Sequence, residues 1–264
     1  FIHEKNAEIS GWTYAHELGR MHLQQTFEDQ ISTTCYDNAT EENADDLLAK
    51  AIADGNNLIF TTSPPLLKAS LKAAIEHPEV KILNCSLNTS HRYIRTYYAR
   101  MYEAKFLMGA IAGAMSKNGK IGYIADYPIF GMAANINAFA LGSKMVNPRA
   151  KVYLEWSTLK DHDVANSFAE NEVHYISGQD MTIPGEPSRH FGLYRDSEDM
   201  PLNLAMPIWH WGKFYEQMIR NIMNGAWKID DTSDSTKGLN YWWGMSAGII
   251  DVICSQHLPI GTAR

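Results

Sequence analysis

The chain has 264 residues, of which 45% are hydrophobic and 20% are charged, and its formal net charge is −7 at pH 7. That length can bury a substantial core in one large domain or in two lobes. The acidic balance disfavours a nucleic-acid partner, because phosphate binding needs clustered Lys and Arg. The longest apolar run, Phe106–Met115, is far shorter than the ~20 residues that span a bilayer.

Cysteine usage and the start of the sequence bear on the compartment. Cys35, Cys85 and Cys254 are too few and too scattered for a disulfide scaffold or a zinc site, and no metal or cofactor is expected. Unpaired cysteines suit a reducing compartment. No charged-then-apolar leader opens the sequence, so any signal peptide or anchor is expected to lie outside it.

The first hundred residues alternate between helix and strand patterns. Ser10 is expected to cap an amphipathic helix over 12–27. The next expected elements are a strand over 31–36, a helix over 41–54, a strand over 57–62, a helix over 66–76 and a strand over 80–84. Such alternation predicts a parallel sheet with right-handed crossovers.

The stretch from Thr96 to Gly142 predicts a long apolar helix, a short turn, a buried strand over Lys120–Ala125 and a second helix. Gly109 and Gly113, four residues apart, would let another element approach the first helix closely. Asp126 and the aromatic after it stand at the strand end, where open parallel sheets place their ligands. Taken alone, Asp126 could also simply cap the following helix.

The alternation then resumes. The expected elements are a strand over 150–156, a short helix over 163–170, strands over 173–177 and 190–194, and a helix over 209–225. Between the last two strands lies only Gly178–Arg189, which is too short and too broken by Pro and Gly for a crossover helix. Two α/β lobes follow: residues 1–116 with 206–264, and residues 117–205, shortened at 178–189.

Several segments resemble one protein family. They are YYARMYEAKFLMGAIAGAMSKNGKIGYIADYPI with INAFALGSKMVNP, and GWTYAHELGR, NNLIFTTS and WHWGKFYEQMI in the same order. Together they are similar to the basic membrane protein (BMP) family of periplasmic-binding-protein-like receptors, many of them lipoproteins that feed ABC transporters. The resemblance implies two Rossmann-like lobes with parallel sheets, of the type I periplasmic-binding-protein kind, that close on a ligand in a cleft between them. Family members with a GWTY-type opening are associated with purine bases or nucleosides.

A purine has apolar faces and a polar edge, so its site needs aromatic plates and a few polar groups. The expected strand ends, and the helix after the central strand, supply the ligand-binding candidates Trp12, Tyr14, Thr62, Ser63, Asp126, Tyr127, Phe130, Asn137, Trp156 and Asp199. Asp199 is assigned by analogy with the family, and Asp196 fits nearly as well. Asn137 is preferred to Asn135 because it lies in the family-like INAF. No catalytic constellation is found, so the expected protein is a receptor and not an enzyme.

Two departures from the family pattern leave alternatives open. Members normally have a full helix where this chain has Gly178–Arg189, and the run RDSEDM is longer than in the family. One alternative is a regulatory or scaffold domain of a larger protein that keeps the fold with altered or lost ligand binding; another is a nucleoside-processing enzyme. The resemblance implies an ABC permease as partner and the extracytoplasmic face of the plasma membrane as location. A fused domain and the cytoplasm are the alternatives.

Overall fold

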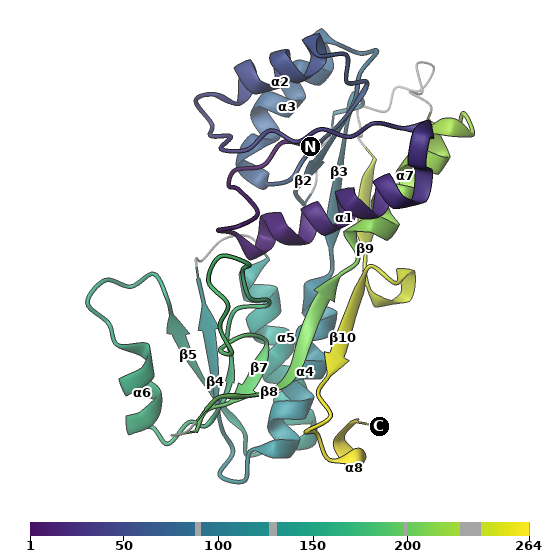
Figure 1. Cartoon of the computed structure of the whole chain (residues 1–264). Helices are drawn as coiled ribbons and strands as arrows, with labels where there is room; N and C mark the ends of the chain where they lie inside the picture. The colour runs from purple at the N-terminus through teal and green to yellow at the C-terminus, as the bar shows by residue number, and fades with distance from the viewer. Residues whose placement is uncertain (88–90, 127–130, 198–199, 228–238, 264) are drawn as a thin grey trace. The chain divides into compact units, whose positions relative to one another are not determined.

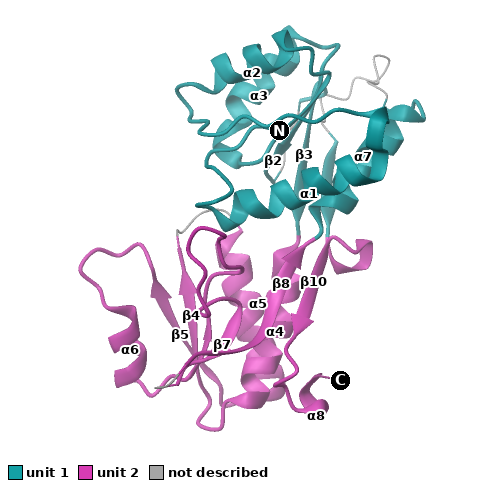
Figure 2. Cartoon of the chain, in the orientation of Figure 1, with its two compact units in different colours: residues 1–99, 210–243 teal, residues 100–209, 244–264 magenta. Residues whose placement is uncertain are grey.

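The computed structural model describes residues 1–264 except 88–90, 127–130, 198–199, 228–238 and 264. The chain divides into two compact units (Figure 2): residues 1–99 with 210–243, and residues 100–209 with 244–264. The lobes expected from the sequence assigned residues 100–116, 206–209 and 244–264 to the first lobe, whereas here they pack in the second unit. Among the described residues, no helix combines the length and apolar character needed to cross a membrane.

The first unit is a four-stranded sheet with helices on both faces (Figure 1). Its elements are α1 (Gly11–Phe27), α2 (Ala44–Ala53), β1 (Leu58–Thr61), a 3₁₀ turn at Pro64–Leu66, α3 (Leu67–Glu76), β2 (Lys81–Cys85), β3 (Ile94–Ala99), α7 (Trp211–Met223) and β9 (Asn240–Trp243). The strand order is β1-β2-β3-β9, and every pairing is parallel, as expected from the alternation.

Alternate residues of these strands serve two different cores. Ile59 and Ile82 pack into an aliphatic cluster with side chains of α2 and α3. Phe60 and Tyr97 belong to an aromatic cluster with α7, in which Tyr97 stacks on Phe214 with ring centroids 4.7 Å apart. The period-2 alternation of a strand explains why neighbouring residues reach opposite faces.

The second unit is a six-stranded mixed sheet. Its elements are α4 (Met101–Met115), β4 (Lys120–Ala125), α5 (Met132–Val146), β5 (Lys151–Trp156), α6 (Val164–Glu170), β6 (Tyr175–Ser177), β7 (Leu193–Arg195), β8 (Leu202–Trp209), a 3₁₀ turn at Met245–Ala247, β10 (Ile250–Cys254) and α8 (Ile260–Ala263). The order is β10-β8-β7-β6-β4-β5. The expected parallel pairing holds for β4 with β5 and β6, while the β6–β7, β7–β8 and β8–β10 pairs are antiparallel.

The antiparallel return follows from the short connection after β6. Residues 178–192 contain no helix, as the sequence predicts for Gly178–Arg189. A parallel neighbour would need a crossover of a dozen or more residues, usually helical. Without one, the chain turns back and β7 pairs antiparallel with β6, through Ile176 and Tyr194.

Helices α4 and α5 pack together on one face of this sheet, over Ile121, Tyr123 and Ala125. A side-chain carbon added at Gly109 would collide with the backbone of Phe139, and one added at Gly142 would collide with the backbone of Phe106. The close approach that Gly109 and Gly113 predict is therefore confirmed. The opposite face, toward α6, holds a smaller cluster of Phe168, Val173, Ile176 and Tyr194.

Three segments differ from the sequence-based expectation. Residues 96–99, assigned to the start of a helical stretch, form the end of β3, since TYYA pairs with β2 and β9. Residues 31–36 form no strand beyond a bridge from Ile2 to Tyr36. Strand β8 was missed because Pro207 interrupts its apolar run, yet it pairs on both sides.

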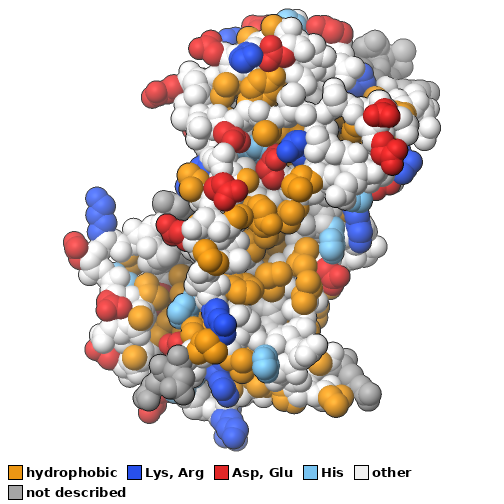
Figure 3. Space-filling model, viewed as in Figure 1, with side chains coloured by type: hydrophobic (Ala, Val, Ile, Leu, Met, Phe, Trp, Pro, Cys, Tyr) orange, Lys and Arg blue, Asp and Glu red, His pale blue; other side chains and the backbone are white. Residues whose placement is uncertain are grey.

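Figure 3 shows acidic and basic side chains interspersed on one face of the molecule.

We expect Gly109→Val to lower the free energy of unfolding by about 3 kcal/mol, because overpacking forces α4 away from α5. Ala114→Val, at an exposed position of the same helix, is the control and should cost only about 0.6 kcal/mol of helix propensity. Urea unfolding of both variants measures the difference. Equal losses for the two would show that the glycine contact does not hold the helices together.

Candidate functional site

In the first unit, Trp12 and the end of β1 are joined by a hydrogen bond. The Nε1 atom of half-buried Trp12 donates to the carbonyl oxygen of Thr62 at 2.7 Å. The indole also meets His16 and Trp211 edge-on, with ring centroids 4.8 and 6.0 Å away. Ser10 caps α1 as expected, accepting from the backbone N–H of Thr13 at 3.2 Å. Helix α1, which carries Trp12, and the residue that follows β1 lie far apart in the sequence, and their hydrogen bond fixes the position of the indole.

Polar side chains line the carboxyl ends of β1 and β2. Thr62 and Ser63, both predicted, are buried, and Ser63 Oγ has no hydrogen-bond partner among the described residues. Asn84, on the neighbouring strand, donates to Thr61 Oγ1 at 2.8 Å and to the Ser63 carbonyl at 2.9 Å. In the part of the chain that the structure describes, Asn84 Oδ1 has no partner. Sequence reasoning missed Asn84, although a polar residue ending the apolar run VKIL is the same signal as in NLIFTTS.

A buried ionic network supports this strand end. His3 lies within 2.9 Å of both Thr62 Oγ1, through Nδ1, and Glu17 Oε1, through Nε2. Arg20 Nε donates to both carboxylate oxygens of Glu17, at 3.0 and 2.9 Å. Burial alone would raise the pKa of Glu17, but the hydrogen bonds from His3 and Arg20 lower it to about 2. Glu17 is therefore ionised at neutral pH and structural.

His16 belongs to the core. It is fully buried, stacks on Trp211 with ring centroids 4.6 Å apart, and its Nδ1 lies 2.5 Å from Tyr215 Oη. Burial lowers the pKa of His16 well below its usual value, and the charge of His3 lowers it further. The neutral ring is consistent with a packing role.

In the second unit, Asp126 connects the ends of β4 and β5. Its Oδ1 accepts from Ser157 Oγ at 2.6 Å, and its backbone carbonyl accepts from Thr158 Oγ1 at 2.5 Å. Trp156 is half-buried and packs against the α4–α5 core. Asn137 is exposed on α5, whereas Asn135 Oδ1 is buried and no described residue pairs with it.

The remaining candidates divide into two groups. Tyr14 lies half-buried on α1. Tyr127, Phe130 and Asp199 lie outside the described residues. Asp196, the alternative to Asp199, is half-buried after β7, and its backbone N–H donates to His174 O at 2.7 Å.

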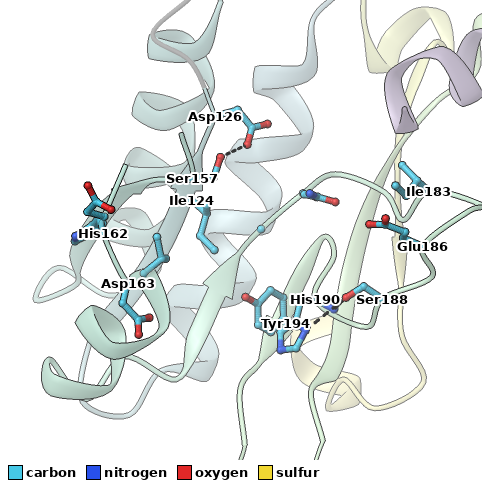
Figure 4. Close-up of a pocket in the computed structure, with 14 residues that line it drawn as sticks. Ile124, Asp126, Ser157, His162, Asp163, Ile183, Glu186, Ser188, His190 and Tyr194 are labelled. Atoms are coloured by element: carbon cyan, nitrogen blue, oxygen red, sulfur yellow. Dashed lines mark hydrogen bonds between the residues drawn. The ribbon is translucent and has the colours of Figure 1, made fainter. Parts of the chain in front are cut away.

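A pocket of about 780 Å³ opens within the second unit, where the carboxyl ends of β4, β5 and β6 meet (Figure 4). Its walls are Ile124, Asp126, Ser157, Asp161, His162, Asp163, Val164, Gly178, Gln179, Ile183, Glu186, Ser188, His190 and Tyr194. Asp126 is the only described candidate among them. Most of the others come from the loops 157–163 and 178–190, which the sequence marked as connections. No set of three or more His, Cys, Asp or Glu in the described chain converges closely enough for a metal ion.

A buried ion pair holds one of these loops. Lys105 of α4, whose side chain is 3% exposed, pairs with Asp180 in the loop after β6. The Lys105 ammonium also lies 5.3 Å from the centroid of the Tyr123 ring. Burial would lower the pKa of Lys105, but the Asp180 carboxylate outweighs this and raises it, so Lys105 stays charged.

The two α/β units have the fold of the type I periplasmic-binding-protein class. Residues 5–185 match the Bmp family, described as ABC transporter substrate-binding protein PnrA-like, and the chain belongs to this family. It is 29% identical over 263 residues to a purine-binding protein of Brucella abortus, covering 94% of this chain and 73% of that one. It is also 24% identical over 253 residues to a putative ABC transporter glucose-binding protein of Haloferax volcanii, covering 90% of this chain and 62% of that one.

Solved structures agree on the fold. A transcriptional activator of the comK gene from Bacillus halodurans superposes with a TM-score of 0.74 at 14% identity, covering 99% of this chain and 92% of that one. An ABC transporter solute-binding protein from Conexibacter woesei gives 0.73 at 13% identity, covering 99% and 90%. At these identities the likeness shows the fold alone.

Because the pKa of Glu17 is lower in the folded protein than in the unfolded chain, its contribution to stability is complete above pH 5 and is lost as the pH falls toward 2. We expect wild-type protein to lose about 2 kcal/mol more unfolding free energy between pH 5 and pH 3 than Glu17→Gln does. Urea unfolding at both pH values measures this. Glu4→Gln, at an exposed position, should keep the wild-type pH dependence; an unchanged dependence in Glu17→Gln would contradict the assignment.

We expect Asp180→Asn to destabilise the protein by about 3 kcal/mol, because it leaves the Lys105 ammonium buried without a counter-charge. Asp45→Asn breaks the exposed Lys72–Asp45 pair, whose side chains are 54% and 49% exposed, and should cost less than about 1 kcal/mol. The double variant Lys105→Met with Asp180→Asn should recover much of the loss. Thermal and urea unfolding compare the variants, and a double variant no better than Asp180→Asn would argue against an ion-pair cause.

Proposed function

We propose that this member of the Bmp family binds a purine nucleoside or base for an ABC-type transporter. The observation that carries the proposal is the hydrogen bond from Trp12 to the Thr62 carbonyl. It fixes an indole beside the strand end at which Ser63 presents a buried hydroxyl that no described residue hydrogen-bonds. An aromatic plate next to unsatisfied polar atoms matches a flat ligand with a hydrogen-bonding edge. The purine-binding relative supports the same ligand class.

The roles follow from the chemistry of each side chain. Trp12 stacks on a purine face, and Ser63, with Asn84, meets donors or acceptors at its edge. Leaving a buried polar atom unsatisfied costs about 1–3 kcal/mol, so a ligand that satisfies Ser63 Oγ and Asn84 Oδ1 regains that energy. Asp126, Asn137, Trp156 and the candidates outside the described residues remain proposed contacts. In this proposal the protein works as a receptor without catalysis, at the extracytoplasmic face of the plasma membrane and anchored as a lipoprotein.

We expect purine bases or nucleosides to raise the melting temperature of protein stripped of co-purified ligand. A ligand at about 100 times its dissociation constant adds roughly 2.7 kcal/mol to stability. Trp12→Ala should abolish the shift and Trp12→Phe should retain part of it, because a smaller aromatic plate is left. Trp242→Ala, which removes a tryptophan that is 43% exposed, is the matched control and should respond like wild type.

The same thermal scan separates the alternatives. A shift with glucose and none with any purine would move the assignment toward the ligand class in the name of the Haloferax relative. No shift with any purine or sugar would overturn the receptor proposal in favour of a regulatory or scaffold domain. A separate assay of the products tests the third alternative: formation of free base from inosine or adenosine would indicate an enzyme.

A further inference from the structure

The second unit carries a concentration of positive charge at the amino ends of β4 and β5, the opposite end of these strands from Asp126. The chain has a net charge of −7, yet the segment from Ala104 to Leu154 contains a single carboxylate, that of Asp126. Four exposed cations of this segment lie in the last turn of α5 or where the chain enters the two strands. These four, here called the basic end, are Lys117, Lys144, Arg149 and Lys151.

Two adjacent turns bring these cations together. The backbone N–H of Lys151 donates to Gly119 O at 2.8 Å, and Asn147 Nδ2 donates to Gly113 O at 3.4 Å. Lys120 and Lys151 are register partners in the parallel pair of β4 and β5, so their side chains leave the same face of the sheet. The turn before β4 and the turn before β5 therefore form one continuous surface.

The charges of the basic end are not neutralised within the described structure. Lys120, beside it, pairs with Glu172 at 2.6 Å. Among the described residues, none of the four side chains of the basic end makes a hydrogen bond or an ion pair. Cations at the carboxyl ends of helices complement the helix dipole, which accounts for Lys117 after α4 and Lys144 in α5 and not for the other two. The basic end is therefore available to an anionic partner.

Large apolar side chains are exposed beside the basic end. Leu141 and Met145 of α5 are 63% and 62% exposed, and Leu107 of α4 is 39% exposed. Leu141 and Met145 are four residues apart, so they share one face of the helix. Lys144 is the one charged residue of α5. Exposed apolar side chains that lie together mark a surface at which a partner binds.

We infer that the basic end, together with Leu141 and Met145, docks on an anionic phospholipid surface. The four cations meet lipid phosphates, and the two apolar side chains enter the layer beneath the headgroups. A polyanion without an apolar layer would satisfy the charges and leave both apolar side chains in water. The inference rests on the proposed location at the plasma membrane for access to such a surface, but it is independent of the purine ligand and of any lipid anchor.

Co-sedimentation of the full chain with vesicles tests the inference. Vesicles of phosphatidylcholine mixed with phosphatidylglycerol should bind the protein, and binding should weaken between about 50 mM and 300 mM salt, because exposed charges are screened. Vesicles of phosphatidylcholine alone should bind little. Equal binding to both kinds of vesicle, or no binding to the anionic vesicles at low salt, would overturn the inference. Tighter binding to polyglutamate or duplex DNA than to anionic vesicles would also overturn it, in favour of another polyanion.

Variants locate the surface. Arg149→Gln with Lys151→Gln should weaken binding to anionic vesicles about twentyfold, since each cation near such a surface contributes about fivefold. Lys68→Gln with Lys213→Gln makes the same charge change at two exposed positions of the first unit and should leave binding within about twofold. Equal loss in the two double variants would refute the assignment of the surface.

The apolar contribution is tested separately. Leu141→Gln with Met145→Gln keeps every charge and should weaken vesicle binding about tenfold, because two apolar side chains no longer enter the lipid layer. An unchanged affinity would contradict docking on lipid. The melting-temperature response to purines should be the same in these variants as in wild type, so failure of the vesicle assay and failure of the purine proposal are seen independently.

Discussion

The second unit depends on the contact between α4 and α5. Gly109 and Gly142 let each helix backbone touch the other, and any side chain there would collide with a carbonyl group. Because the two helices lie this close, they share one face of the sheet and bury Ile121, Tyr123 and Ala125 beneath them. Because of this contact, α4 packs in the second unit. The two helices also hold β4 in place, and Asp126 follows the last residue of that strand.

The loop after β6 shows how a local change of sequence alters both topology and chemistry. The short segment turns β7 antiparallel to β6, and among the described elements α6 is the helix that packs on this face of the sheet. Burying Lys105 costs desolvation energy that its pair with Asp180 offsets. The pair fixes the loop on α4, and the uncovered face becomes a pocket with an acidic rim. One shortened connection accounts for all three features.

Membership of the family does not settle the ligand. One relative is named for purine and another for glucose, and the solved structures that share the fold include both a transport protein and a transcriptional activator. The choice therefore lies with individual side chains. In the first unit the proposed ones are Trp12 and the buried polar atoms of Ser63 and Asn84, next to the hydrogen-bonded network of His3, Glu17 and Arg20.

The sequence by itself determined the family, the alternation of strands and helices, the cap at Ser10, the glycine contact of α4 and the loop at 178–189, because local patterns and short-range chemistry encode each of them. Only the tertiary structure decided the strand character of residues 96–99 and 202–209, since strand pairing is made with distant segments. It likewise revealed Asn84 beside Ser63, Lys105 beside Asp180, and the cavity around Tyr194. Burial and the presence or absence of a partner are properties of packing, which no single stretch of sequence contains.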